Sequence, residues 1–126
     1  MQQPIVISGA GILGCYISCA LSLQGIDSIV LEKKDDEVED SVRTITLNPF
    51  SKNLLDKIGI ENDYSMINKM EVKDFDGTGK IVFKSSEIGI DHLAYVSDFA
   101  TLLMAVRKKA SAVSYTHLTL PTTSVV

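Results

Sequence analysis

The first third of the chain has the pattern of a strand, a helix and a second strand. Residues 5–7 and 28–31 are short apolar runs rich in β-branched side chains, which is typical of strands buried on both faces. Residues 12–23 between them are mostly apolar and lack proline, so they predict a buried helix that Gly25 can end. This order predicts a βαβ unit and a fold of the α/β class.

A second amphipathic helix is predicted after residue 47. Asn48 is a good N-cap, Pro49 suits the first helical position, and Gly59 can end the helix. The apolar side chains that share one face of this helix are Phe50, Leu54 and Ile58. We expect that face to lie against the core.

The second half of the chain predicts a β-hairpin, a strand and a third helix. Residues 70–75 and 80–83 flank a turn of aspartate and glycine, which favours the hairpin, and residues 94–96 predict a further short strand. Asp98 can cap a helix with a helical repeat of apolar residues. The predicted helix ends on three cations, where the helix dipole favours positive charge: Arg107, Lys108 and Lys109.

The turn between the first strand and the first helix has the spacing G-x-G-x-x-G. Gly9 allows the tight turn, Gly11 lets a pyrophosphate approach the backbone, and Gly14 lets the helix pack closely on the strand. A helix N-terminus also attracts phosphate, through its unpaired N–H groups and its dipole. The sequence therefore predicts a dinucleotide-binding turn.

Glu32 follows the second strand at about the distance from Gly9 where a ribose-binding acid is expected, roughly 20 residues on. FAD and NAD both present ribose hydroxyls, so Glu32 fits either cofactor. Three functions stay open: an FAD-dependent enzyme, an NAD-dependent Rossmann dehydrogenase, and a non-catalytic nucleotide-binding module. The predicted hairpin favours the first, because a plain Rossmann domain would continue with alternating strands and helices.

Charge and hydropathy exclude some partners. The net charge is −4, and no cluster of Lys and Arg alternates with aromatic residues, which argues against a nucleic-acid surface. Residues 12–23 are fewer than the roughly 20 that a membrane span needs, and the N-terminus lacks the basic flank of a signal peptide. We expect a cytoplasmic protein, with the charged residues 33–40 in a solvated loop.

Cys15 and Cys19 are the only cysteines, and they lie four residues apart with no histidine nearby in sequence. We expect both to be small buried packing residues in a reducing compartment. The sequence therefore predicts no disulfide and no metal site.

Several blocks of the sequence come in the order seen in one family of flavoproteins. They are the glycine turn, Glu32, and residues 43–47, 74–79 and 91–96. Over about residues 4 to 110 the chain resembles the ubiquinone-biosynthesis hydroxylases of the octaprenylphenol hydroxylase type. These are FAD-dependent aromatic hydroxylases with the p-hydroxybenzoate hydroxylase fold. The block that begins at Arg43 and the pair at residues 95–96 are more particular to this family than the first two blocks.

The resemblance implies a monooxygenase that uses NAD(P)H, FAD and O₂ to hydroxylate a prenylated phenol. It implies that Gly9, Gly11 and Gly14 hold the FAD pyrophosphate and that Glu32 holds the adenosine ribose. Arg43 would lie beside the cofactor, where a guanidinium can meet phosphate, or alternatively pair with the acidic run before it. No catalytic residue is expected in this chain, because the redox chemistry is the flavin's own. A peripheral contact with a membrane or with a ubiquinone-biosynthesis complex is also implied.

The chain departs from the family pattern in two ways. It has Phe99, Ala100 and Thr101 early in the last predicted helix, where relatives often carry a polar or basic residue near the flavin. The family's later Asp-Gly and Gly-Asp blocks, and most of its substrate sheet, have no counterpart here. The resemblance thus implies an incomplete fold, a Rossmann-like FAD-binding βαβ start with an added β-hairpin. Residues 1–112 would be the N-terminal part of the FAD-binding domain, without activity alone.

The last residues differ from the rest in composition. All charged residues lie at or before Lys109. Residues 113–123 look like the peptide that one reading frame of a transposase-type sequencing-library adapter encodes. We therefore expect residues 113–126 to be a non-native tail, and the DNA behind these codons would test this.

Overall fold

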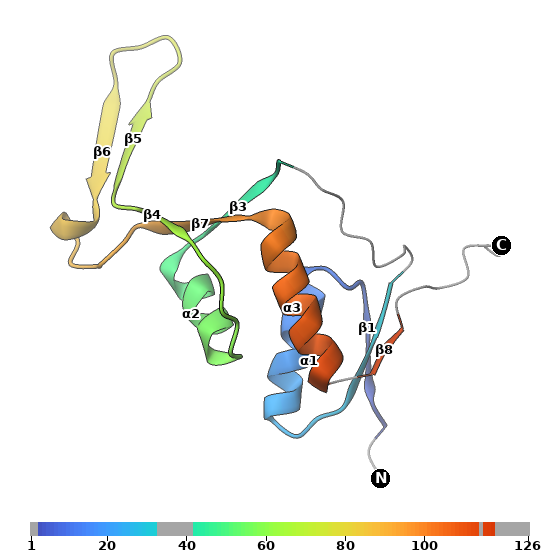
Figure 1. The fold of residues 1–126 in the computed structure, drawn as a ribbon. Helices are drawn as coiled ribbons and strands as arrows, with labels where there is room; N and C mark the ends of the chain where they lie inside the picture. The colour runs from blue at the N-terminus through green and yellow to red at the C-terminus, as the bar shows by residue number, and fades with distance from the viewer. Residues whose placement is uncertain (1–2, 33–41, 114, 118–126) are drawn as a thin grey trace.

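The computed structural model describes residues 3–32, 42–113 and 115–117, which form two three-stranded sheets, a hairpin and three α-helices. Figure 1 shows α1 and α3 lying between the parallel sheet and α2, while the hairpin projects from the other end of the molecule. The charged residues 33–40 lie outside the described residues, so the predicted solvated loop stays a prediction.

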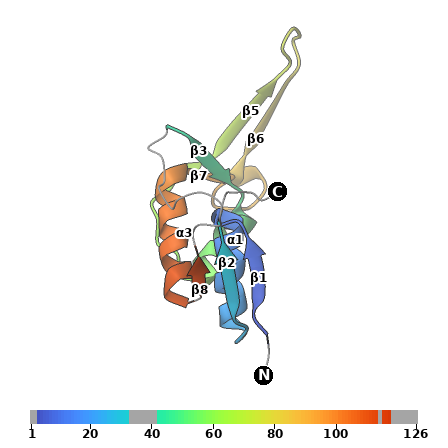
Figure 2. The ribbon, with the colours of Figure 1, turned by 90° about the vertical axis from the view of Figure 1, so that its right-hand side faces the viewer.

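The parallel sheet contains the predicted βαβ unit. Strand β1 (Ile5–Ser8) leads into helix α1 (Ile12–Leu23) and then into strand β2 (Ser28–Leu31). The two strands are parallel neighbours, and α1 lies behind them in the view of Figure 2. A third strand, β8 (Tyr115–His117), pairs in parallel with the other edge of β2, so three residues of the expected tail take part in this sheet.

The second sheet is antiparallel, and the sequence analysis did not predict it. Strand β7 (Ala94–Asp98) lies in the centre, with β3 (Thr44–Leu47) on one side and β4 (Ser65–Ile67) on the other. The amide of Phe99 donates to the carbonyl oxygen of Arg43 over 3.0 Å. The start of β3 is thereby tied to the residue that begins α3.

Helix α2 (Pro49–Lys57) begins as predicted, because Asn48 Oδ1 accepts a hydrogen bond from the Ser51 amide over 2.7 Å. Its expected inward face is partly wrong. Phe50 is 70 % exposed, whereas Leu54 is half-buried and Ile58 is buried. Leu55, which lies outside the predicted face, is buried as well. The later turns of α2 carry the packing, so a side chain in the first turn lies outside the contact.

Helix α3 (Phe99–Val113) runs four residues beyond its predicted end at Lys109. Asp98 Oδ2 accepts from the amide and the hydroxyl of Thr101, which confirms the predicted cap. Because the helix continues, Arg107 does not lie in its last turn. The expected role of Arg107 as a cation at the C-terminal end of the dipole is therefore wrong.

The predicted hairpin is confirmed by strands β5 (Lys69–Lys73) and β6 (Lys80–Lys84), which a short 3₁₀ turn, η1 (Ser85–Glu87), follows. The register pairs Met70 with Phe83. Nearly all of the hairpin is exposed, in keeping with its projection in Figure 1.

The core lies between α1 and α3 and where α1 packs on β2. Cys15 and Cys19 are 1 % and 3 % exposed, which confirms their expected burial. Ser18 and Ser28 meet beside them through a buried hydrogen bond of 2.6 Å. The same cluster includes further buried residues of β2, β3 and α3 and of the C-terminal end of α2: Val30, Leu47, Leu55, Ile58, Leu102 and Val106.

Candidate nucleotide-binding site

The three glycines of the turn are required for three different reasons. Gly9 has φ +108°, a backbone conformation that residues other than glycine rarely adopt. A Cβ at Gly14 would overlap the carbonyl oxygen of Gly9, so the close packing of helix on strand needs glycine there. Gly11 has φ −81°, and a Cβ there would meet nothing within 4 Å. Neither backbone strain nor packing requires glycine at residue 11.

Gly11 is also the N-cap of α1, and no side chain caps the helix there. The first N–H groups of a helix have no partner within the helix, and the dipole makes this end attractive to anions. Open space in front of Gly11 therefore lies at the end of the helix that suits phosphate.

Glu32 is brought onto the turn, as expected of a residue at the end of β2. Its Oε2 accepts a hydrogen bond from the Ala10 amide over 2.8 Å, and the Gly9 amide donates to the Leu31 carbonyl oxygen. The acid and the glycine turn thus lie together at the carboxyl ends of two neighbouring parallel strands. This is where open α/β sheets bind ligands.

The sequence analysis missed Arg107 as part of this site. Its Nε donates to the Ala10 carbonyl oxygen over 2.7 Å, and its Nη2 lies 4.0 Å from Glu32 Oε2. The helical spacing gave one signal, since Arg107 lies four residues after Leu103, which belongs to the apolar repeat of this helix. Only the packing of α3 on α1 shows that its side chain reaches the turn.

Arg43 lies on the other sheet, just before β3. It is exposed, and its guanidinium carbon lies 4.0 Å from the centre of the Phe99 ring. The segment that departs from the family pattern thus includes a ring, Phe99, on which Arg43 stacks. The predicted contact of Arg43 with the cofactor stays a prediction.

Cys15 lies beside the site, but its thiol is unreactive at neutral pH. Burial raises the pKa of its thiol to about 11, although the nearby Arg107 guanidinium opposes this shift. The thiol is therefore protonated at neutral pH, and a protonated thiol is neither a nucleophile nor a metal ligand.

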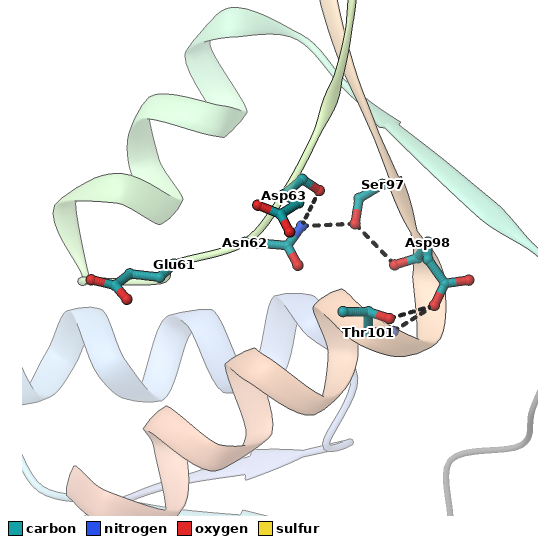
Figure 3. Close-up of a pocket in the computed structure, with 6 residues that line it drawn as sticks. All are labelled: Glu61, Asn62, Asp63, Ser97, Asp98 and Thr101. Carbon is teal, nitrogen blue, oxygen red and sulfur yellow. Dashed lines mark hydrogen bonds between the residues drawn. The ribbon is translucent and has the colours of Figure 1, made fainter.

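A polar hollow of about 510 Å³ lies near the start of α3 (Figure 3). Asn62 donates to Ser97 across it, and Asp98 accepts from Thr101, which lowers the pKa of Asp98. The lining carries three carboxylates, from Glu61, Asp63 and Asp98, which would repel a pyrophosphate. This hollow is therefore a poor candidate for the nucleotide.

An apolar groove of about 290 Å³ lies between the start of α1, β3 and α2. Its lining includes Ile12, Leu13, Ile45 and Leu54.

Among residues 3–32, 42–113 and 115–117, no three His, Cys, Asp or Glu side chains gather closely enough to hold a metal ion. Within the same described ranges no helix is both long and apolar enough to cross a membrane.

Comparison with known families gives a match over most of the chain. The family model described as FAD binding domain matches residues 2–112. The match includes the glycine turn, Glu32, Arg43 and Arg107, and it ends just before residues 113–126.

Solved structures with similar folds carry different chemistries. The Diels-Alderase PyrE3 of the pyrroindomycin pathway superposes with a TM-score of 0.74 at 21 % identity, over 99 % of this chain and 27 % of its own. The p-nitrophenol 4-monooxygenase PnpA from Pseudomonas putida DLL-E4 gives 0.70 at 16 %, over 92 % and 31 %. A 2-methyl-3-hydroxypyridine-5-carboxylic acid oxygenase gives 0.69 at 16 %, over 94 % and 32 %. At these identities the likeness shows the fold alone.

Proposed function

Because the chain belongs to the FAD binding domain family, we propose that it binds FAD at the glycine turn as the N-terminal part of a flavin-dependent monooxygenase. The p-hydroxybenzoate hydroxylase-type fold expected from the sequence is confirmed for this part. The chain spans 27 to 32 % of the length of the three solved structures above. The activity is therefore proposed for an enzyme that includes this chain.

The open space at Gly11 is the observation that carries the proposal. Glycine is needed there neither for a left-handed backbone nor for packing, and as an N-cap it is no better than serine, threonine, asparagine or aspartate. The approach of a ligand is the remaining physical reason for glycine rather than one of those residues. Gly9 and Gly14 shape the turn around that space. The residues present therefore fit a pyrophosphate at this place.

Glu32 fits the adenosine ribose. A carboxylate can accept several hydrogen bonds at once, so Glu32 can hold the Ala10 amide and still accept from ribose hydroxyls. FAD, when bound, supplies the redox and oxygen chemistry. The residues of this chain would bind the cofactor and fix its orientation, and we assign none of them a catalytic role.

The finer function rests on the resemblance at residues 43–47 and 95–96. It supports NAD(P)H as the electron donor and a prenylated phenol of ubiquinone biosynthesis as the substrate. A contact with a membrane surface or a biosynthetic complex would give the enzyme access to such a hydrophobic substrate. Assays on an enzyme that includes this chain would compare the prenylated phenol with the same phenol lacking the prenyl group. Equal turnover of both would contradict the finer proposal.

Nucleotide binding can be tested on the 126-residue chain. Titration calorimetry should detect binding of ADP, which carries the adenosine and pyrophosphate part of FAD, and Glu32→Ala should weaken it by about 1.5 to 3 kcal/mol. Lys108→Met, on the exposed side of α3, is the matched control and should bind as the unchanged chain does. Absence of binding, or equal binding by the Glu32→Ala chain, would contradict the site.

The identity of the cofactor can be determined with an enzyme that includes this chain. We expect it to purify yellow, with FAD as the flavin that denaturation releases. A colourless protein that binds NAD instead would favour the dehydrogenase alternative. Flavin binding without any oxidation of NAD(P)H would favour the non-catalytic module.

A further inference from the structure

Ala10 lies between Gly9 and Gly11 in the turn, and charged side chains hold both of its peptide groups. Its N–H donates to Glu32, 22 residues away, and its carbonyl oxygen accepts from Arg107, 97 residues away. Ala10 is fully buried, at 0 % exposure, so a loss of either partner would leave a buried polar group unsatisfied. The turn is thus fixed from two sides by distant parts of the chain.

Arg107 also acts on the carboxylate. Its Nη2 lies 4.0 Å from Glu32 Oε2, the same oxygen that accepts the Ala10 amide. The two side chains are only 17 % and 20 % exposed, so their attraction is screened less than that of an open surface pair. The guanidinium therefore favours the position of Glu32 in which the carboxylate stays on the turn.

We propose that Arg107 is a positioning residue for the nucleotide site. It holds the glycine turn and Glu32 in the arrangement that receives the pyrophosphate and the ribose, and this role rests on the proposed function. Arg107 acts through Ala10 and Glu32 rather than on a reacting atom. Its planar fork sends Nε to one partner and Nη2 toward the other, which the single ammonium of a lysine cannot reproduce.

NMR on the 126-residue chain, with ADP as the probe, tests the proposal. The Ala10 amide proton should resonate downfield and exchange slowly, as expected of a charge-assisted hydrogen bond in a buried turn. In Arg107→Met it should shift upfield, and both its exchange rate and the ADP dissociation constant should rise about tenfold. Lys108→Met removes a cation from the neighbouring exposed position and should change none of these quantities.

A merely structural Arg107 would give a different result. Arg107→Met would then lower the melting temperature but leave the Ala10 amide and the ADP affinity unchanged well below melting, which would overturn the proposal. If Arg107→Met does not fold, Arg107→Lys decides in the same way. An upfield shift and faster exchange of the Ala10 amide proton in Arg107→Lys support the role. An unchanged chemical shift and exchange rate together with unchanged ADP affinity overturn it.

Failure of the proposed function itself would be visible separately. The unchanged chain would then bind no ADP, and the positioning role would fall with the site. The response of the Ala10 amide to Arg107→Met would still show whether Arg107 holds the turn.

Discussion

Gly14 faces the carbonyl oxygen of Gly9 so closely that a Cβ at residue 14 would overlap it. The first turn of α1 therefore packs directly on the backbone of the glycine turn. We predict that Gly14→Ala destabilises the chain by about 2 kcal/mol or more, because the clash is with backbone that cannot rotate away. Urea unfolding followed by circular dichroism would measure this. A stability equal to that of the unchanged chain would contradict the packing.

Gly11→Val should separate binding from folding. Residue 11 has an extended backbone and open space, so valine should cost at most about 1 kcal/mol of stability, mainly as a poorer N-cap. The same side chain would fill the space proposed for the pyrophosphate, and ADP affinity should fall at least about tenfold. Calorimetry and a melting curve on one sample would show both effects. Normal ADP binding by a folded Gly11→Val chain would exclude the site.

The sequence predicted the βαβ unit well because its signals are local. The apolar runs, the glycine spacing and the caps at Asn48 and Asp98 each depend on neighbours a few residues away. The sequence could not show that residues 44–47 and 65–67 flank one strand, because antiparallel pairing depends on contacts between distant segments. Arg107 was misplaced for the same reason. Its partners are 97 and 75 positions away, and its own helix appeared to end nearby.

Arg43→Lys tests the stacked arginine. The guanidinium over Phe99 contributes about 0.5 to 1 kcal/mol at an exposed site, so the stability of the chain should change little. Flavin affinity of an enzyme that includes this chain should fall by more than a charge-conserving change suggests, since an ammonium cannot replace a planar fork. Phe99→Leu is the companion variant, because it removes the ring and keeps the arginine. Unchanged flavin binding in Arg43→Lys would favour the surface-pairing alternative.

The pair formed by Ser18 and Ser28 joins α1 to β2 beneath the site. Their hydroxyl oxygens lie 2.6 Å apart, and both residues are buried. Ser18→Ala alone should cost about 1 to 3 kcal/mol, because it leaves the Ser28 hydroxyl without this partner. The double alanine variant should cost less than the sum of the two single changes. A double-mutant cycle in urea measures the difference, and strict additivity would contradict the coupling.

The two cysteines give a prediction with a defined pH dependence. Burial raises the pKa of Cys15 to about 11 and also raises that of Cys19. In the folded chain the thiols keep their protons above pH 9.0, where unfolded thiols lose theirs. The contribution of Cys15 to stability should therefore be constant below pH 9 and fall between about 9 and 11.

At pH 8 the same burial should make the folded chain react slowly with a disulfide reagent, because the thiolate is the reactive form. Addition of urea should speed the reaction of both thiols together. Cys15→Ala should leave one slow thiol and remove the part of the alkaline loss of stability that belongs to Cys15. If the folded chain reacted as fast as the unfolded one, the α1 face that carries Cys15 and Cys19 would not be packed against α3 and β2. The packing of α1 that supports the glycine turn would then be contradicted as well.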